Sequence, residues 1–183
     1  MSRKRTRLRV VSIAGAAAVV AALGAVTFNA SAAEQAQAGA EFTRGGIPSN
    51  IRPPAGSKFV GSAKVTSGTQ TYTCTGGVFT GASVPEAQLA GPIGRIHHYK
   101  GPTWEHTRDG SIITATKIQD SPVTGSIPQL LLQVNGHSGK TGSLTKVNYI
   151  QRLFTSGGAA PAGACTDGQT KAVKYGATYV FWA

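Results

Sequence analysis

TWEHTRDGSIITATKI, residues 103–118, is the stretch that decides the fold of this chain. Asp109-Gly110 at its centre is a two-residue turn typical of β-hairpins, because both residues tolerate the positive φ angles that such turns require. The segments on either side, Thr103–Arg108 and Ser111–Ile118, are therefore predicted to be the two strands of an antiparallel hairpin.

Further strands are predicted on both sides of this hairpin, separated by turn residues. They are Phe59–Thr66, Thr69–Cys74, Val78–Phe79, Ile93–Tyr99, Ile127–Val134, Leu144–Thr155 and Ala172–Trp182. The segment Val84–Ala90 is expected to form a single helical turn, because Pro85 suits the first position of a helix. The run Leu130–Leu132 predicts a strand that is buried on both faces.

The pattern as a whole predicts an all-β fold. No segment has the periodicity of a sustained amphipathic helix, and short strands alternate with glycine-rich turns. We expect one antiparallel domain over residues 57–183, either a jelly-roll-like β-sandwich or a partly closed β-barrel. The pattern leaves both architectures open.

The N-terminal residues 1–32 are predicted to be a secretory signal peptide. Five basic residues lie within residues 3–9, the uncharged run Val10–Phe28 follows, and Ala30-Ser31-Ala32 offers a cleavage site. The alternative is a retained membrane anchor, since about 20 apolar residues can span a bilayer. Residues 33–56 have little apolar periodicity and are predicted to be a flexible linker or arm. The sequence thus predicts a secreted, extracellular protein.

The charge of the chain gives little support for nucleic-acid binding. Five of the 18 basic residues belong to the predicted signal, so 13 remain against 7 acids, and the net charge falls from +11 to +6. The remaining cations are scattered singly, without the basic run or recognition motif that nucleic-acid binding requires. Attraction to anionic wall polymers stays open, beside a merely solvated basic surface.

The two cysteines, Cys74 and Cys165, are predicted to form a disulfide, because an even count in a secreted chain indicates pairing. The bond would tie an early strand to the loop before the last strand. Two free buried thiols are the alternative.

Several stretches together resemble a known family. They include the segments 68–74 (GTQTYTC), 98–105 (HYKGPTWE), 109–111, 127–132, 149–152 and 157–165. In this order they are similar to domain-of-unknown-function family 3455, secreted bacterial and fungal proteins whose fungal members are often labelled malate dehydrogenase. The chain departs from that family at Gln129 and at Val78-Phe79, where the family tends to have tryptophan. A dehydrogenase activity has no support here, because the strand-GxGxxG-helix unit that binds dinucleotides is missing from the sequence.

The candidate polar site combines His98, Trp104, Glu105, Asp109, Tyr149 and Arg152. On the predicted hairpin, Trp104 and His106 share one face and Glu105 lies on the other, so the spacing does not force a metal site. Asp109 is best explained as a turn former. Arg152 is expected to pair with Glu105 or Asp109 inside the fold.

An aromatic platform for a sugar or peptide is a further hypothesis for Trp104, Tyr99, Tyr149 and Trp182, with core packing as the alternative. No catalytic residue, metal or cofactor is predicted.

Two classes of function follow. The first is a non-catalytic extracellular domain that binds a glycan, a wall polymer or a protein. The second is a small secreted hydrolase or metal-dependent enzyme that uses the region of His98, Glu105 and Asp109, and it requires these side chains to meet in one pocket. We expect the first.

Overall fold

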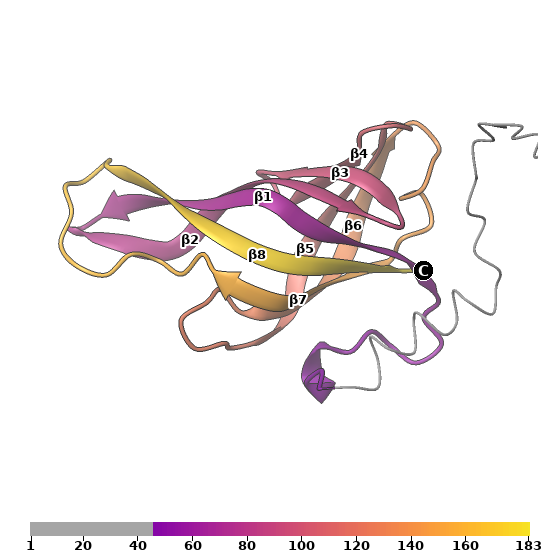
Figure 1. The fold of residues 1–183 in the computed structure, drawn as a ribbon, viewed down its shortest axis with the longest axis horizontal. Helices are drawn as coiled ribbons and strands as arrows, with labels where there is room; N and C mark the ends of the chain where they lie inside the picture. Colours follow the sequence, from indigo (N-terminus) through magenta and orange to yellow (C-terminus); the bar gives the residue numbers. More distant parts are fainter. Residues whose placement is uncertain (1–45) are drawn as a thin grey trace, which may run out of the picture.

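The structure is a computed structural model that describes residues 46–183, without the side chains of residues 80–82. A short 3-10 turn, η1, precedes eight strands, and their bounds are η1 Ser49–Ile51, β1 Phe59–Thr75, β2 Val78–Gly91, β3 Gly94–Tyr99, β4 Thr103–His106, β5 Ser111–Ser121, β6 Gln129–Gly139, β7 Tyr149–Gly157 and β8 Thr170–Trp182. Each strand pairs antiparallel with the next, and β8 pairs with β1, so the sheet closes into a barrel (Figure 1). The predicted all-β class is confirmed, and the barrel is the architecture found.

Two predicted segments are wrong. Leu144–Asn148, expected to begin a strand, belongs to the loop before β7. Val84–Ala90 is part of β2 and not a helical turn. β2 pairs with β3 only from Ala87 to Gly91, so no strand lies beside Pro85 on the β3 side. A proline, which has no N–H to donate, is therefore tolerated at this position.

The central hairpin forms, but its turn is longer than predicted. The last pair of β4 and β5 is Glu105 with Ile112, and the bounds of the two strands leave Thr107–Gly110 as a four-residue loop. The amide of Gly110 donates to the carbonyl of His106 at 2.8 Å, and Gly110 has a φ of 73°. The Asp-Gly signal therefore located the reversal correctly and gave the wrong loop length.

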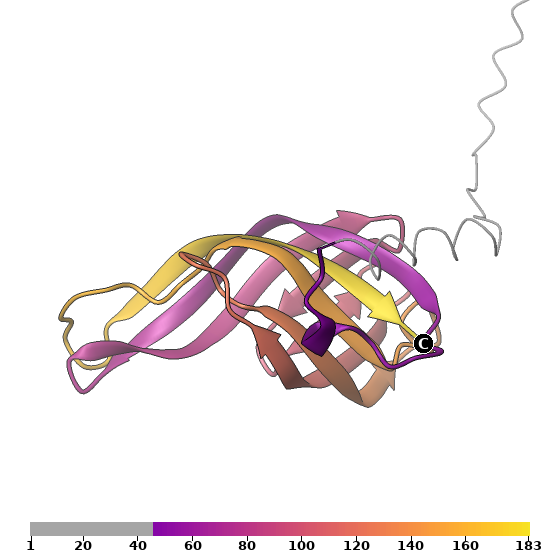
Figure 2. The same ribbon diagram turned by 90° about the horizontal axis from the view of Figure 1, so that it is seen from below.

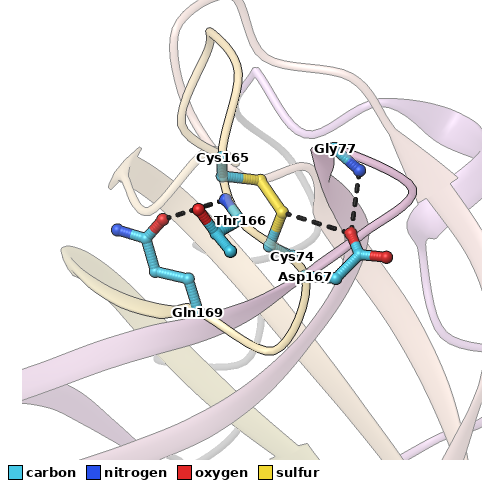
Figure 3. The surroundings of a disulfide bond; sticks show 6 residues. All are labelled: Cys74, Gly77, Cys165, Thr166, Asp167 and Gln169. Atoms are coloured by element: carbon cyan, nitrogen blue, oxygen red, sulfur yellow. Dashed lines mark hydrogen bonds between the residues drawn. A yellow bond between two sulfur atoms is a disulfide. The ribbon is translucent and has the colours of Figure 1, made fainter.

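Three long strands extend beyond the barrel as an arm. The arm consists of residues 69–75 of β1, 78–86 of β2 and 170–175 of β8, and both views show it projecting from one end (Figures 1 and 2). The predicted disulfide, Cys74–Cys165, is confirmed and lies at the arm's tip (Figure 3). Beside it, the amide of Gly77 donates to the Asp167 carboxylate at 2.9 Å, so the β7–β8 loop is fastened to the β1–β2 turn.

The inward-facing side chains of the barrel form one core. Along β8 the residues Tyr175, Ala177, Tyr179 and Phe181 alternate into it, as their spacing of two predicts. At the end away from the arm, Leu144 and Val147 of the β6–β7 loop are fully buried and close the lumen. The lumen therefore has a filled end and an arm end.

Asp109 holds this closing loop in place. Its carboxylate accepts hydrogen bonds from the amide and hydroxyl of Ser111, at 2.9 and 2.6 Å, and from the amide and hydroxyl of Ser143, at 2.8 and 2.7 Å. Burial alone would raise the pKa of Asp109, but these hydrogen bonds outweigh it and hold the pKa well below its usual range. The predicted role of Asp109 in the turn is confirmed, and the same carboxylate also links two loops.

A second apolar cluster lies outside the barrel, where the segment before β1 crosses the sheet (Figure 2). This outer cluster consists of Ile47, Ile51, Leu131, Leu153, Val180 and Trp182, with Phe59 and Tyr149 packed against it. Fully buried Gln151 joins the two layers. Its Nε2 donates to the carbonyl of Ile51 at 2.6 Å, and its Oε1 accepts from the indole of Trp182 at 2.9 Å. This covering explains why Leu130–Leu132 is buried on both faces.

The described part of the predicted linker, residues 46–56, is thus packed on the barrel through Ile47 and Ile51. The rest of that linker and the predicted signal peptide, residues 1–32, lie outside the described residues. Within residues 46–183 we find no helix of the length and apolar character needed to cross a membrane.

Candidate ligand pocket in the barrel

The arm end of the lumen contains a cavity of about 150 Å³. All eight strands contribute to its wall, because inward-facing positions of a small barrel converge on one axis. The lining residues are Gln70, Ser83, Pro85, His98, Pro102, Trp104, Lys117, Leu130, Leu132, Arg152 and Tyr179. A cavity of this size suits a single six-membered ring, since an apolar cavity of about 150 Å³ is known to hold benzene.

Two buried donors in this wall have no partner. The Nε2 of Gln70 and the Nε1 of Trp104 make no hydrogen bond within residues 46–183, although the two side chains are only 3% and 1% exposed. Gln70 uses its other end to accept a hydrogen bond from Ser83 at 2.6 Å. An unpaired buried donor costs about 1–3 kcal/mol. Both unpaired donors belong to side chains that line the same cavity, which makes this cavity the candidate ligand site.

His98 gives the wall an acceptor. Its Nδ1 lies 2.8 Å from the carbonyl of Thr103, which can only accept, so Nδ1 carries the proton and Nε2 is the acceptor. Nε2 has no hydrogen-bond partner in the described part of the chain. Burial, together with the smaller effect of the Arg152 charge, lowers the pKa of His98 to about 4, so the ring is neutral at pH 7.

The aromatic side chains form a rigid wall around His98. Its ring stacks on Trp104 with centroids 4.2 Å apart, and both rings meet Tyr179 edge to face. The hydroxyls of Tyr179 and Tyr175 are 3.3 Å apart. Burial raises the pKa of Tyr175. The nearby side chain of Gln70 acts to lower that pKa, but its amide nitrogen makes no hydrogen bond within residues 46–183.

Arg152 is the cation of the pocket, and the expected pairing with Glu105 or Asp109 is wrong. Its Nε and Nη2 both donate to the carbonyl of Pro128, at 3.1 and 2.9 Å. No carboxylate of residues 46–183 lies within ion-pair distance of it. The reason is topological: Glu105 faces outward, and Asp109 lies at the filled end of the barrel.

The remaining predicted site residues lie outside the cavity. Glu105 accepts from Tyr99 at 3.3 Å, and Tyr99 packs against His97. Tyr149 belongs to the outer cluster together with Trp182. The proposed aromatic platform is therefore not formed, because its four members lie in three separate places. Of the predicted set, only His98, Trp104 and Arg152 come together.

Sequence reasoning missed Gln70 and Tyr179 as pocket residues. A signal for both was present. Gln70 is a polar residue in line with Tyr72 and Cys74 on the inward face of its strand, and Tyr179 is a hydroxylated member of the apolar face of β8. Their proximity depends on closure of the barrel, which the strand pattern does not reveal.

The residues named for the alternative enzyme do not converge. His98 is in the lumen, Glu105 is on the outer face, and Asp109 is at the opposite end of the barrel. Residues 46–183 also contain no group of three or more His, Cys, Asp or Glu side chains arranged to hold a metal ion.

The fold and the pocket together define a small closed antiparallel barrel with a polar cavity at one end of its lumen. Residues 54–183 match the model of the family described as "Protein of unknown function (DUF3455)", and the chain belongs to that family. The resemblance noted in the sequence is therefore confirmed. Neither a curated protein nor a solved structure with significant similarity to the chain was found.

Proposed function

We propose that this protein is a secreted, non-catalytic binding protein that holds one small, ring-sized ligand in its lumen. The ligand is either a free molecule or the terminal sugar residue of an extracellular glycan. One observation carries this function: Gln70 and Trp104, which line one cavity, each have a buried donor without a partner in residues 46–183. Water can satisfy such donors in the free protein, and a ligand with matched acceptors would replace it.

The geometry supports binding better than catalysis. The wall of the cavity is rigid and aromatic, and it carries donors, one neutral histidine acceptor and one unpaired cation. Hydrolysis by the three residues considered above would need His98, Glu105 and Asp109 within reach of one substrate atom, which the barrel prevents.

The test is calorimetric titration with four ring compounds: glucose, glucuronate, 4-hydroxybenzoate and 4-hydroxybenzamide. We expect at least one of them to bind and to raise the melting temperature. Gln70→Leu should weaken that binding at least tenfold and change stability little, because removal of the unsatisfied donor offsets loss of the acceptor for Ser83. Gln88→Leu, on the exposed face of β2, is the control and should bind like the wild type. Failure of all four compounds to bind would refute the proposed function.

Secretion is the second part of the proposal. It is supported by the signal-like pattern of residues 1–32 and by the Cys74–Cys165 disulfide, which an oxidising compartment favours. The intact mass of the protein recovered from the culture medium tests it. We expect a chain that begins near Ala33 and is two mass units lighter than its reduced form. A full-length chain retained in the cell would contradict it.

A further inference from the structure

The charge of the pocket wall narrows the class of ligand. Arg152 and Lys117 line the cavity, and no described lining residue is acidic. Lys117 lies at the rim and is paired with Asp120 at 3.0 Å, with both side chains well exposed. Arg152 is only partly exposed, and a backbone carbonyl is the only acceptor that it has within residues 46–183. The unbalanced positive charge of the pocket therefore belongs to Arg152.

The guanidinium acts inside the lumen and not only at its edge. Arg152 pairs across the sheet with Leu130 and with Tyr179, both of which line the cavity. Its charge lowers the pKa of both His98 and Tyr175, as expected for a cation near the two rings. A partly buried cation without a counter-charge attracts an anion, and a carboxylate can bind it through charge-assisted hydrogen bonds.

The unpaired polar groups of the wall also differ in whether they donate or accept hydrogen bonds. Gln70, Trp104 and Arg152 can only donate with the atoms left unpaired, whereas the Nε2 of His98 can only accept. A ligand that matches all of them carries a carboxylate for the donors and a hydroxyl for His98. The cavity volume limits the remainder to about one six-membered ring.

We infer that the ligand is an organic anion with one six-membered ring, a carboxylate held by Arg152, and a hydroxyl that donates to His98. This inference rests on the proposed function. A uronic acid, free or at the end of a glycan, and an aromatic hydroxy acid share this chemistry.

The experiment compares each acid with a neutral counterpart: glucuronate with glucose, and 4-hydroxybenzoate with 4-hydroxybenzamide. In the wild type we expect the acid of one of these two pairs to bind at least tenfold more tightly than its neutral counterpart. Preference for glucuronate assigns a saturated sugar acid, and preference for 4-hydroxybenzoate assigns an aromatic acid.

Variants then test the cation. Arg152→Gln should remove the preference for the acid, and Arg152→Lys should retain part of it because the charge remains. Lys146→Gln, at an exposed lysine of the β6–β7 loop outside the cavity, is the control and should change the preference less than threefold, since that charge is solvated and screened. Circular dichroism confirms that each variant is folded, and Arg152→Lys covers the case in which Arg152→Gln does not fold.

The outcomes separate the two proposals. Equal affinity for acids and neutral compounds, or a preference that survives in Arg152→Gln, would overturn the anion inference and leave the binding function standing. If none of the four compounds binds, both proposals fail.

Discussion

His98 makes the stability of the protein depend on pH, because its imidazole binds a proton more weakly in the folded protein than in the unfolded chain. Burial holds its folded pKa at about 4, against 6.5 in the unfolded chain, so the unfolded state takes up the proton first as the pH falls. The contribution of His98 to stability is complete above pH 6.5 and is lost between 6.5 and about 4. The loss amounts to about 3 kcal/mol, since one pKa unit is worth about 1.4 kcal/mol.

Urea unfolding at pH 7.5, 5.5 and 4.5 measures this dependence. The decrease in unfolding free energy should be smaller in His98→Gln, which has no imidazole to titrate. An NMR titration of the folded protein supplies an independent check, and a His98 ring that titrates near 6.5 would contradict the prediction.

Asp109 is the second residue with a clear energetic role. Asp109→Ala removes the acceptor for four hydrogen bonds, two of them from the amide groups of Ser111 and Ser143. We expect the unfolding free energy to fall by more than about 2 kcal/mol, because hydrogen bonds to a charged group contribute about 1.5–3 kcal/mol each. Asp120→Ala, which breaks only the exposed pair with Lys117, should cost no more than about 1 kcal/mol. Equal losses in the two variants would show that Asp109 does not anchor the closing loop.

The sequence predicts which types of residue form the site better than it predicts where they lie in the fold. A histidine, a tryptophan and an arginine on predicted strands carry binding chemistry, and the sequence therefore predicts His98, Trp104 and Arg152. The same reasoning predicts Glu105, although strand alternation places it opposite Trp104. An isolated glutamine such as Gln70 has no chemical signal until a cavity forms around it.

Among the elements, the β2–β3 turn has a strict steric requirement at Gly94. Gly94 has a φ of 113°, and a Cβ at this position would overlap the His106 ring, whose Nε2 donates to the carbonyl of Ile93 at 3.0 Å. Gly94→Ala should therefore be destabilising both through backbone strain and through the clash. Gly125→Ala is the control, because Gly125 also has a positive φ of 71° but has open space around it.

Thermal unfolding of the two variants separates the effects. Gly125→Ala should cost about 1–2 kcal/mol, the usual penalty for a side chain in the left-handed region, and Gly94→Ala should cost clearly more. Similar losses would indicate that His106 moves aside freely.

Strand positions were predicted better than strand ends and partners. Seven of the strands were placed from alternation and turn residues, because each burial pattern is local. The sequence does not predict β2 as one strand through Pro85. A proline is compatible with a strand only where no neighbouring strand needs its N–H, and here that depends on where β3 ends. The choice between sandwich and barrel depends on pairing of β1 with β8, the most distant strands in the sequence.

For the whole molecule, the disulfide is expected to act on stability and not on the pocket. It closes a loop with a sequence separation of 91 residues, which is worth about 4–5 kcal/mol on the chain-entropy model. Replacing both cysteines with serine should lower the melting temperature strongly. Affinity for whichever ring compound the wild type binds should remain within threefold, because Cys74 and Cys165 lie at the tip of the arm (Figure 3). Loss of binding in a folded double variant would contradict this separation.

The arm has a consequence for how the molecules behave toward one another at high concentration. Closing a barrel removes every free strand edge, but the arm creates two again, along residues 79–86 of β2 and 170–174 of β8. An open edge invites a strand from a second chain and so promotes aggregation. Pro85 interrupts the first edge, and exposed Lys171 and Lys174 place positive charges on the second. Pro85 and the two lysines are therefore expected to oppose pairing of these edges between molecules.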